Sequence, residues 1–348
     1  MAIKNEIKEK ISIEVIKTLV AALDFIPDEN EIVRSPFHEA FLKAFSDKLK
    51  DNVSDVPFFI SLSSWLHGLN TTLGQVFFEN VAHILCNGEK REYTSKKIGN
   101  LQITKTQQNT ITQIINDLST STKLPDLKKE NEKLLQDDGS QKVKAEDFSV
   151  DVFFEDLDKI VAIELKTVKS NSGGMKGEKQ KILEGKAALF HLFPNKEINF
   201  FFGFPFDPTV DIVKEKVTSF NKKRFFNSIV NANKFCAENE FLVASELWDF
   251  LSGEKNTMEI ILEIINSIAT TDFLAKFRLL TDNSKRNTVE YSKQLKEWFL
   301  FSELKLIEND SVIRAKLDTK TTRIYNKLSF DKNGKYDWTR YNVLEKLI

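Results

Sequence analysis

The sequence has 348 residues, of which 41% are hydrophobic and 29% charged, which excludes a disordered or collagen-like chain. Lys plus Arg number 50 and Asp plus Glu 51, so an anionic partner would have to be bound by a local basic surface. Gly (12) and Pro (7) are scarce while Phe is abundant (29), so we expect a helix-rich α/β or α+β protein of about two domains.

The two cysteines, Cys86 and Cys236, lie far apart and have no Cys or His companion at metal-ligand spacing. This favours neither a disulfide framework nor a zinc site. The start of the chain is charged and helical in period, and no apolar run approaches the roughly 18 residues of a membrane span. We therefore expect a cytoplasmic protein that does not contact a membrane.

Residues 2–124 are mainly helical in period, with prolines marking turns, and the polar residues 125–147 predict a solvent-facing link. The pattern then changes to that of strands. FSVDVFF (148–154) and IVAIELKTV (160–168) predict a β-hairpin, because both are apolar, β-branched and aromatic and an acidic turn separates them. A Gly/Ser loop, a helix from about Glu178 to Phe193 and a third strand, EINFFFGFPF (197–206), complete the order strand, strand, helix, strand. From about residue 211 the helical period returns.

Glu164 and Lys166 share one face of the second predicted strand, because side chains alternate between the faces of a strand. The flanking residues are apolar on both faces, which predicts a central strand. There each charge costs several kcal/mol unless it is compensated. A structural Glu/Lys pair at the sheet rim and a functional site are both open interpretations.

Asp151 in the preceding strand favours the functional interpretation. It lies in an apolar run, 13 positions before Glu164, and a hairpin would bring the two carboxylates together beside the Lys166 amine. Two converging carboxylates suit a hard divalent cation, and Mg²⁺ typically takes one or two carboxylates and fills its other positions with water and phosphate oxygens. We therefore predict a divalent cation site.

Asp151, the 12 residues that follow it and Glu164-Leu165-Lys166, on a strand-strand-helix-strand unit, resemble the catalytic motif of the PD-(D/E)XK nucleases, with Val150 at the usual proline position. The resemblance implies a restriction-endonuclease-like core, in which a central mixed sheet is flanked by helices. It also implies that Asp151, Glu164 and the backbone carbonyl of Leu165 bind Mg²⁺, and that Lys166 positions the attacking water. Such hydrolysis of a phosphodiester bond would leave 5′-phosphate and 3′-hydroxyl ends.

A third acid is predicted from the helix over residues 73–85. Its side chains form a broad apolar arc with a narrow polar stripe opposite, made of Gln75, Glu79 and His83. The stripe either faces water or forms a polar wedge toward the cation. PD-(D/E)XK nucleases often supply an acid from a helix ahead of the first catalytic strand, so the resemblance implies that Glu79 belongs to the site.

Four segments carry a wider resemblance to type II restriction endonucleases, specifically to the group that cleaves GGNCC-type or GGWCC-type sites. They are RSPFHEAF (34–41), LNTTLGQVFFENVA (69–82), DVFFEDLDKIVAIELKTVKSNSGG (151–174) and ASELWDFLSGEKNT (244–257). This resemblance implies that the partner is double-stranded DNA with a short palindromic site. A palindrome presents the same groove edges twice, so we expect a homodimer.

On this interpretation residues 1–124 form a helical lobe that contributes to the nuclease core, 125–210 form the catalytic core, and 211–348 form a helical region with basic DNA-contacting segments. The residues from Arg314 to Arg340 include eight basic side chains against three acids. Which arginines read bases is left open. Two alternatives also stay open: a structure-specific or repair nuclease on the same catalytic unit, and a non-catalytic DNA-binding protein whose acidic cluster is structural.

Overall fold

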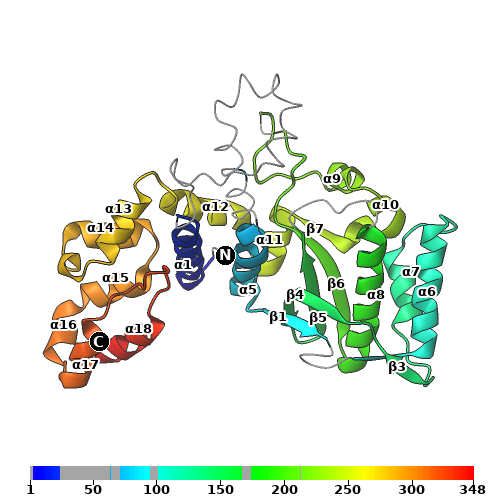
Figure 1. Ribbon diagram of the computed structural model, residues 1–348, viewed down its shortest axis with the longest axis horizontal. Coiled ribbons are helices and arrows are strands. Elements are labelled where there is room, and N and C mark those ends of the chain that lie inside the picture. The colour runs from blue at the N-terminus through cyan, green and yellow to red at the C-terminus, as the bar shows by residue number, and fades with distance from the viewer. Residues whose placement is uncertain (1–2, 24–62, 64–70, 95–100, 167–173, 212) are drawn as a thin grey trace, which may run out of the picture. The chain divides into compact units, whose positions relative to one another are not determined.

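The structure is a computed structural model that describes residues 3–23, 63, 71–94, 101–166, 174–211 and 213–348 (Figure 1). The chain divides into two compact units. The first, which we call the sheet unit, contains Met1–Ile3 and Phe78–Ile260. The second, which we call the helical unit, contains Lys4–Phe77 and Ile261–Ile348. These boundaries do not coincide with the divisions expected near residues 124 and 210.

A five-stranded mixed sheet in the order β1-β4-β5-β6-β7 forms the centre of the sheet unit. Its first three strands pair antiparallel, and β5, β6 and β7 pair parallel. The strands are β1 (Glu89–Tyr93), β4 (Phe148–Glu155), β5 (Lys159–Leu165), β6 (Glu197–Phe204) and β7 (Phe241–Val243). The prediction of a helix-rich α/β protein with a central mixed sheet flanked by helices is confirmed.

The predicted hairpin, helix and third strand are present as β4, β5, α8 (Gly174–Leu192) and β6. Strand β5 is central, as predicted, and all of its residues after Lys159 are buried. Helix α8 covers one face of the sheet: a Cβ on Gly185 would lie 2.7 Å from a ring carbon of Phe200. Helix α11 (Ser245–Ser252) covers the other face, where its Phe250 ring packs 5.6 Å from the ring of Phe201.

The remaining elements of the sheet unit surround this core. They are α5 (Phe78–Cys86), β2 (Gln102–Thr104), α6 (Lys105–Ser119), α7 (Leu127–Leu134), β3 (Lys142–Lys144), α9 (Lys222–Ser228), α10 (Ala232–Phe235), η3 (Glu238–Glu240) and the start of α12 (Thr257–Ile268). Strands β2 and β3 form a separate antiparallel pair.

Three sequence predictions about these elements were wrong. Residues 125–147 are not only a link, because they contain α7, which Asp126 caps and which buries Glu130 and Leu134. The stretch predicted to be helical up to residue 124 contains β1 and β2, and the region after 211 contains β7. Strand β1 is polar because it lies at the edge of the sheet, and β2 and β7 have only three residues each, too few to show a period.

The helical unit contains α1 (Asn5–Leu23), the π-helix η2 (Leu73–Phe77), the rest of α12, α13 (Phe273–Leu280), η4 (Asn283–Lys285), α14 (Val289–Glu297), α15 (Phe301–Glu308), α16 (Asp310–Ala315), α17 (Thr319–Tyr325), α18 (Trp338–Leu344) and η5 (Glu345–Leu347). Its core contains stacked rings, with Phe273 5.5 Å from the buried Trp298. Among the described residues of either unit, no helix is long and apolar enough to cross a membrane.

Candidate active site

Asp151 and Glu164 lie at matching positions of the β4–β5 hairpin. Val152 pairs with Ile163 as the last backbone pair, and one step further along this antiparallel register lie Asp151 and Glu164. Beyond that pair the link between the strands is made by the Asp151 side chain, whose Oδ2 accepts a hydrogen bond from the Leu165 amide at 2.9 Å. The structure therefore places the two predicted carboxylates side by side on neighbouring strands.

A β-bulge sets the direction of Asp151. Strand β1 pairs Glu89 with Phe153 and Arg91 with Val150, so two residues of β4, Asp151 and Val152, lie opposite the single residue Lys90. A bulge locally bends its strand and redirects a side chain, and bulges are common beside active sites.

His83 on α5 fixes the main chain at this bulge. Its Nε2 lies 2.7 Å from the carbonyl oxygen of Asp151. A carbonyl oxygen can only accept a hydrogen bond, so Nε2 carries the proton and donates it. The side chain and the main chain of Asp151 are thus both held in place.

Lys166 follows β5 directly and contacts two carboxylates. Its Nζ lies 3.1 Å from Oε1 of Glu164 and 2.8 Å from Oε1 of Glu178 on α8. Burial acts to lower the pKa of Lys166, but the Glu164 and Glu178 carboxylates outweigh it, and the pKa is raised above its usual value. Lys166 is therefore an ammonium group beside Glu164.

Glu164 is paired on its other side with Lys181 of α8. The Lys181 Nζ lies 2.8 Å from Oε2 of Glu164. This oxygen is buried and accepts no well-aligned hydrogen bond, so the contact is an ion pair in which the oxygen keeps lone pairs for a further ligand.

Lys90 joins Glu79 to Asp151. Its Nζ lies 3.1 Å from Oε2 of Glu79 and 3.3 Å from Oδ1 of Asp151. Burial raises the pKa of the Glu79 carboxyl and the Asp151 charge adds to this, while the Lys90 hydrogen bond opposes it. Glu79 and His83 of the predicted polar stripe therefore contact β1 and β4 of the sheet, whereas the side chain of Gln75 lies outside the described residues.

Three residues of this site were missed in the sequence. Lys90 was missed because its strand is too polar to be recognised. Glu178 and Lys181 could have been found from their spacing, because residues three apart on a helix lie on the same side. Together with the predicted residues they form what we call the site cluster: Glu79, Lys90, Asp151, Glu164, Lys166, Glu178 and Lys181.

The donor set of the site cluster fits a divalent cation. Within the described part of the chain, no three His, Cys, Asp or Glu side chains gather closely enough to hold a metal ion by themselves. Asp151 and Glu164, with the backbone carbonyl of Leu165, instead supply a few hard oxygen donors. That is the number Mg²⁺ takes from a protein when water and phosphate oxygens fill its remaining positions.

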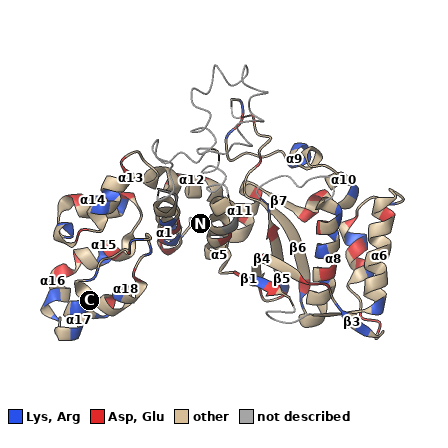
Figure 2. Cartoon of the chain, in the orientation of Figure 1, with Lys and Arg blue, Asp and Glu red and all other residues tan. Residues whose placement is uncertain are grey.

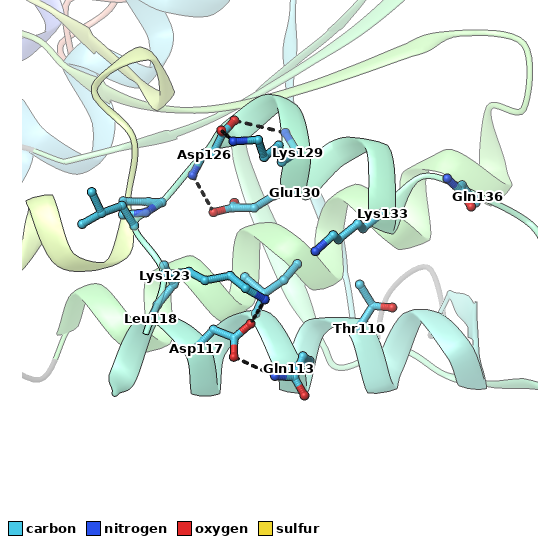
Figure 3. A pocket seen from close by; sticks show the side chains of 13 residues that line it. Thr110, Gln113, Asp117, Leu118, Lys123, Asp126, Lys129, Glu130, Lys133 and Gln136 are labelled. Atoms are coloured by element: carbon cyan, nitrogen blue, oxygen red, sulfur yellow. Dashed lines mark hydrogen bonds and ion pairs between the residues drawn. The ribbon is translucent and has the colours of Figure 1, made fainter. Parts of the chain in front are cut away.

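A hollow in the sheet unit lies between α6 and α7 and has a volume of about 830 Å³ (Figure 3). Four of its charged groups pair within the lining: Lys123 contacts Asp117 and Lys129 contacts Asp126. No residue of the site cluster lines it. This hollow is therefore separate from the candidate active site.

Comparison with known proteins decides the family. The sequence profile of the HinfI type II restriction endonucleases matches residues 3–269, a range that contains the whole site cluster. The chain belongs to this HinfI family. It is also 42% identical to the type II restriction enzyme MjaII of Methanocaldococcus jannaschii, over 98% of this chain and 96% of that protein.

Membership of the HinfI family identifies the chain as a site-specific deoxyribonuclease. The resemblance to type II restriction endonucleases is thereby confirmed, and the repair nuclease and the non-catalytic DNA-binding protein are set aside. Of the segments that carried the resemblance, residues 34–41, 69–70 and 167–173 lie outside the described residues.

Proposed function

We propose that the chain is a Mg²⁺-dependent enzyme that hydrolyses both strands of DNA at a short palindromic site and leaves 5′-phosphate and 3′-hydroxyl ends. The observation that supports this most directly is the placement of Asp151 and Glu164 one step beyond the last β4–β5 pair, with the Lys166 ammonium 3.1 Å from Glu164. In the family resemblance these are the residues of the catalytic motif. An enzyme that acts on cellular DNA belongs in the cytoplasm.

In this proposal Asp151, Glu164 and the carbonyl of Leu165 would hold Mg²⁺, which would supply Lewis acidity for the phosphate and the attacking water. The Lys166 ammonium donates hydrogen bonds that orient the attacking water and offsets the negative charge that develops on the phosphate. Glu79 adds a third carboxylate beside Asp151, and Lys90 and His83 keep Asp151 in position.

Cleavage of plasmid DNA tests the proposal. Purified protein with Mg²⁺ should give discrete fragments, and EDTA should prevent them. Fragment ends should be ligated directly by DNA ligase, and ligation should fail after phosphatase treatment, because ligase requires a 5′-phosphate. Absence of cleavage in Mg²⁺, or ends that ligase cannot join, would contradict the proposal.

Sequencing the fragment ends tests the expected target. The resemblance implies GGNCC-type or GGWCC-type sites, so every cut should fall within such a sequence. Cuts at an unrelated sequence would retain the enzyme class and overturn only the target.

Each chain has one such catalytic motif, which is why we propose a homodimer on DNA. One active site cuts one strand, so a double-strand cut at a palindrome is most simply made by two copies related by two-fold symmetry. Sizing the complex on a short cognate duplex, with Ca²⁺ in place of Mg²⁺, should give two chains per duplex. One chain per duplex, with nicked product in Mg²⁺, would exclude the homodimer.

A further inference from the structure

The helical unit exposes a row of cations around α17. Lys320 and Arg323 lie on α17, Lys316 precedes it and Lys327 follows it, and all four are exposed. Figure 2 shows the blue of Lys and Arg on the ribbon at α17. We call these four residues the α17 surface. They lie after residue 269, beyond the range that the family profile matches.

The cations of the α17 surface outnumber the acids between them, since Asp318 is the one acid in residues 316–327. Across the described part of the chain, no Asp or Glu forms an ion pair with any of the four. Asp318, the acid closest in sequence, attracts Lys320 only as a nearby charge, while its Oδ1 caps α17 by accepting hydrogen bonds from the amide and hydroxyl of Thr321. Asp310 is likewise engaged with Arg314 and Tyr325.

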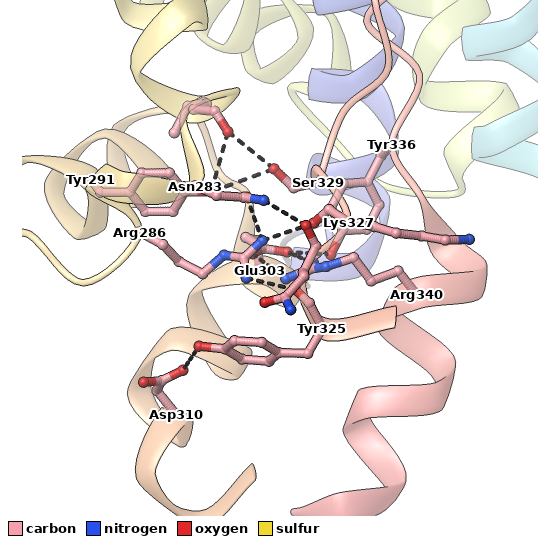
Figure 4. A network of polar contacts seen from close by, with 12 residues as sticks. Asn283, Arg286, Tyr291, Glu303, Asp310, Tyr325, Lys327, Ser329, Tyr336 and Arg340 are labelled. Carbon is pink, nitrogen blue, oxygen red and sulfur yellow. Dashed lines mark hydrogen bonds and ion pairs between the residues drawn. The ribbon is translucent and has the colours of Figure 1, made fainter. Parts of the chain in front are cut away.

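A buried arginine fixes the backbone that carries this surface (Figure 4). Arg286 donates from Nη1 to the carbonyl of Tyr325 at 2.7 Å and from Nη2 to the carbonyl of Lys327 at 2.9 Å. Asn283 donates to the carbonyl between them, that of Asn326, at 2.7 Å. Three consecutive carbonyls at the end of α17, which a helix leaves unsatisfied, are thus held by side chains.

The arginines that hold this frame cannot themselves reach DNA. Arg286 and Arg340 are 4% and 1% exposed, and Arg340 donates to both oxygens of the fully buried Glu303, at 2.6 and 3.2 Å. Tyr336 donates to the same carboxylate. The buried frame of Arg286 and Arg340 is therefore distinct from the exposed α17 surface.

We propose that the α17 surface binds the phosphate backbone of the DNA substrate. Exposed cations without carboxylate partners suit a polyanion, because binding releases the counterions condensed on DNA and breaks no ion pair of the protein. Phosphate contacts fix the position of a protein on the duplex and carry no sequence information. The inference rests on the proposed function and assigns part of its DNA affinity to residues outside the active site.

Equilibrium binding in Ca²⁺, where no cleavage occurs, tests the inference. The variant carries Lys320→Gln, Arg323→Gln and Lys327→Gln. The matched control carries Lys285→Gln, Lys293→Gln and Lys296→Gln, three exposed lysines of the same unit that change the net charge equally. Affinity for a 30-base-pair duplex is measured from about 50 to 200 mM salt, a range in which phosphate contacts change it strongly.

The α17 variant should bind about a hundredfold more weakly at 100 mM salt, and its salt slope should be shallower by roughly 3, close to 0.9 for each lost contact. The control should bind within about threefold of the wild type. A wild-type affinity and slope in the α17 variant, with unchanged thermal unfolding, would overturn the inference. If the wild-type protein neither binds nor cleaves DNA, the proposed function fails instead, so the two failures are distinguishable.

Discussion

Helix α8 contributes charged side chains to two clusters that differ in their access to water. Toward the site cluster it contributes Glu178 and Lys181, which are 23% and 24% exposed. Toward α7 and η3 it contributes Lys179 and Lys186, which are 0% and 1% exposed. We call the second group, Glu130, Lys179, Lys186 and Glu240, the buried cluster.

The buried cluster has short ion pairs that water cannot replace. Lys179 Nζ lies 2.6 Å from Glu130 and 2.7 Å from Glu240. Burial acts to lower the pKa of Lys179, but the two carboxylates outweigh it and raise the pKa to about 12. Lys186 lies 3.9 Å from Glu240 and burial lowers its pKa to about 8. The same residue types are therefore held in ion pairs away from water on one side of α8 and are partly open to water on the other.

The largest change in the free energy of unfolding should come from removing the central lysine of the buried cluster. Lys179→Met leaves Glu130 and Glu240 buried without their main partner and should lower the free energy of unfolding by about 3–5 kcal/mol. Lys181→Met, on the same helix, removes a partly exposed ion pair and should cost less than about 1 kcal/mol. Urea unfolding of both variants measures the difference, and equal losses would erase the distinction between the clusters.

In the site cluster the effect should be on the reaction instead. Asp151→Asn, Glu164→Gln and Lys166→Ala should each reduce the cleavage rate at least a hundredfold, about 3 kcal/mol, because each removes a group that acts in the transition state. Unfolding should change little. Asp156→Asn, in the exposed turn of the same hairpin, is the control and should cleave normally. Near-normal cleavage by any of the three would remove that residue from the active site.

The second acid of α8, Glu184, shows what burial does to a carboxyl that has no cationic partner in the described part of the chain. It is 4% exposed and has no ion-pair partner among the described residues, and burial raises its pKa to about 7. The raised pKa favours the protonated form, so its stabilising contribution is complete below pH 4.5 and is lost as the pH rises through 7.

Glu184→Gln should therefore be more stable than the wild type at pH 8, by about 1–3 kcal/mol, and equally stable at pH 4.5. Thermal unfolding at the two pH values measures this. The same difference at both pH values would show that the carboxyl does not titrate in this range.

The smallest expected effect is on the cation concentration that cleavage requires. Glu79→Gln should raise the Mg²⁺ concentration for half-maximal cleavage by about tenfold, about 1.4 kcal/mol, because it removes a negative charge beside Asp151. Lys90→Gln should shift Ca²⁺ binding, measured by calorimetry, toward higher affinity, because its ammonium competes for the same carboxylates. Unchanged titrations for both variants would separate Glu79 and Lys90 from the cation site.

The central hairpin could be predicted from its two apolar strands, and its acids could be predicted because they are charged residues within those strands. Asp151 and Glu164 lie in apolar strands, where a charge without a purpose is costly, and this made them visible in the sequence. The roles assigned to them stay predictions.

The rest of the site cluster was missed for two different reasons. Lys90 is an ordinary surface residue by sequence, and only the fold brings it against the acids. Glu178 and Lys181 lie three residues apart on a helix, and this spacing could have indicated them. The bulge at Asp151 depends on the pairing of β1 with β4, which lie more than 50 residues apart and leave no local signal. The buried cluster was also missed, because the sequence of α7 is polar and does not indicate that Glu130 is buried.

The close approach of α8 to β6 has a consequence for how mutations in this enzyme would be interpreted. Gly185 lies one turn after Lys181, and even a methyl group there would lie 2.7 Å from Phe200. An alanine would force either the Phe200 ring or α8 to shift, and a shift of α8 would move Lys181 relative to Glu164. A genetic screen for lost cleavage would then score Gly185 beside the true catalytic residues, and only a measurement of protein packing would tell the two kinds of hit apart.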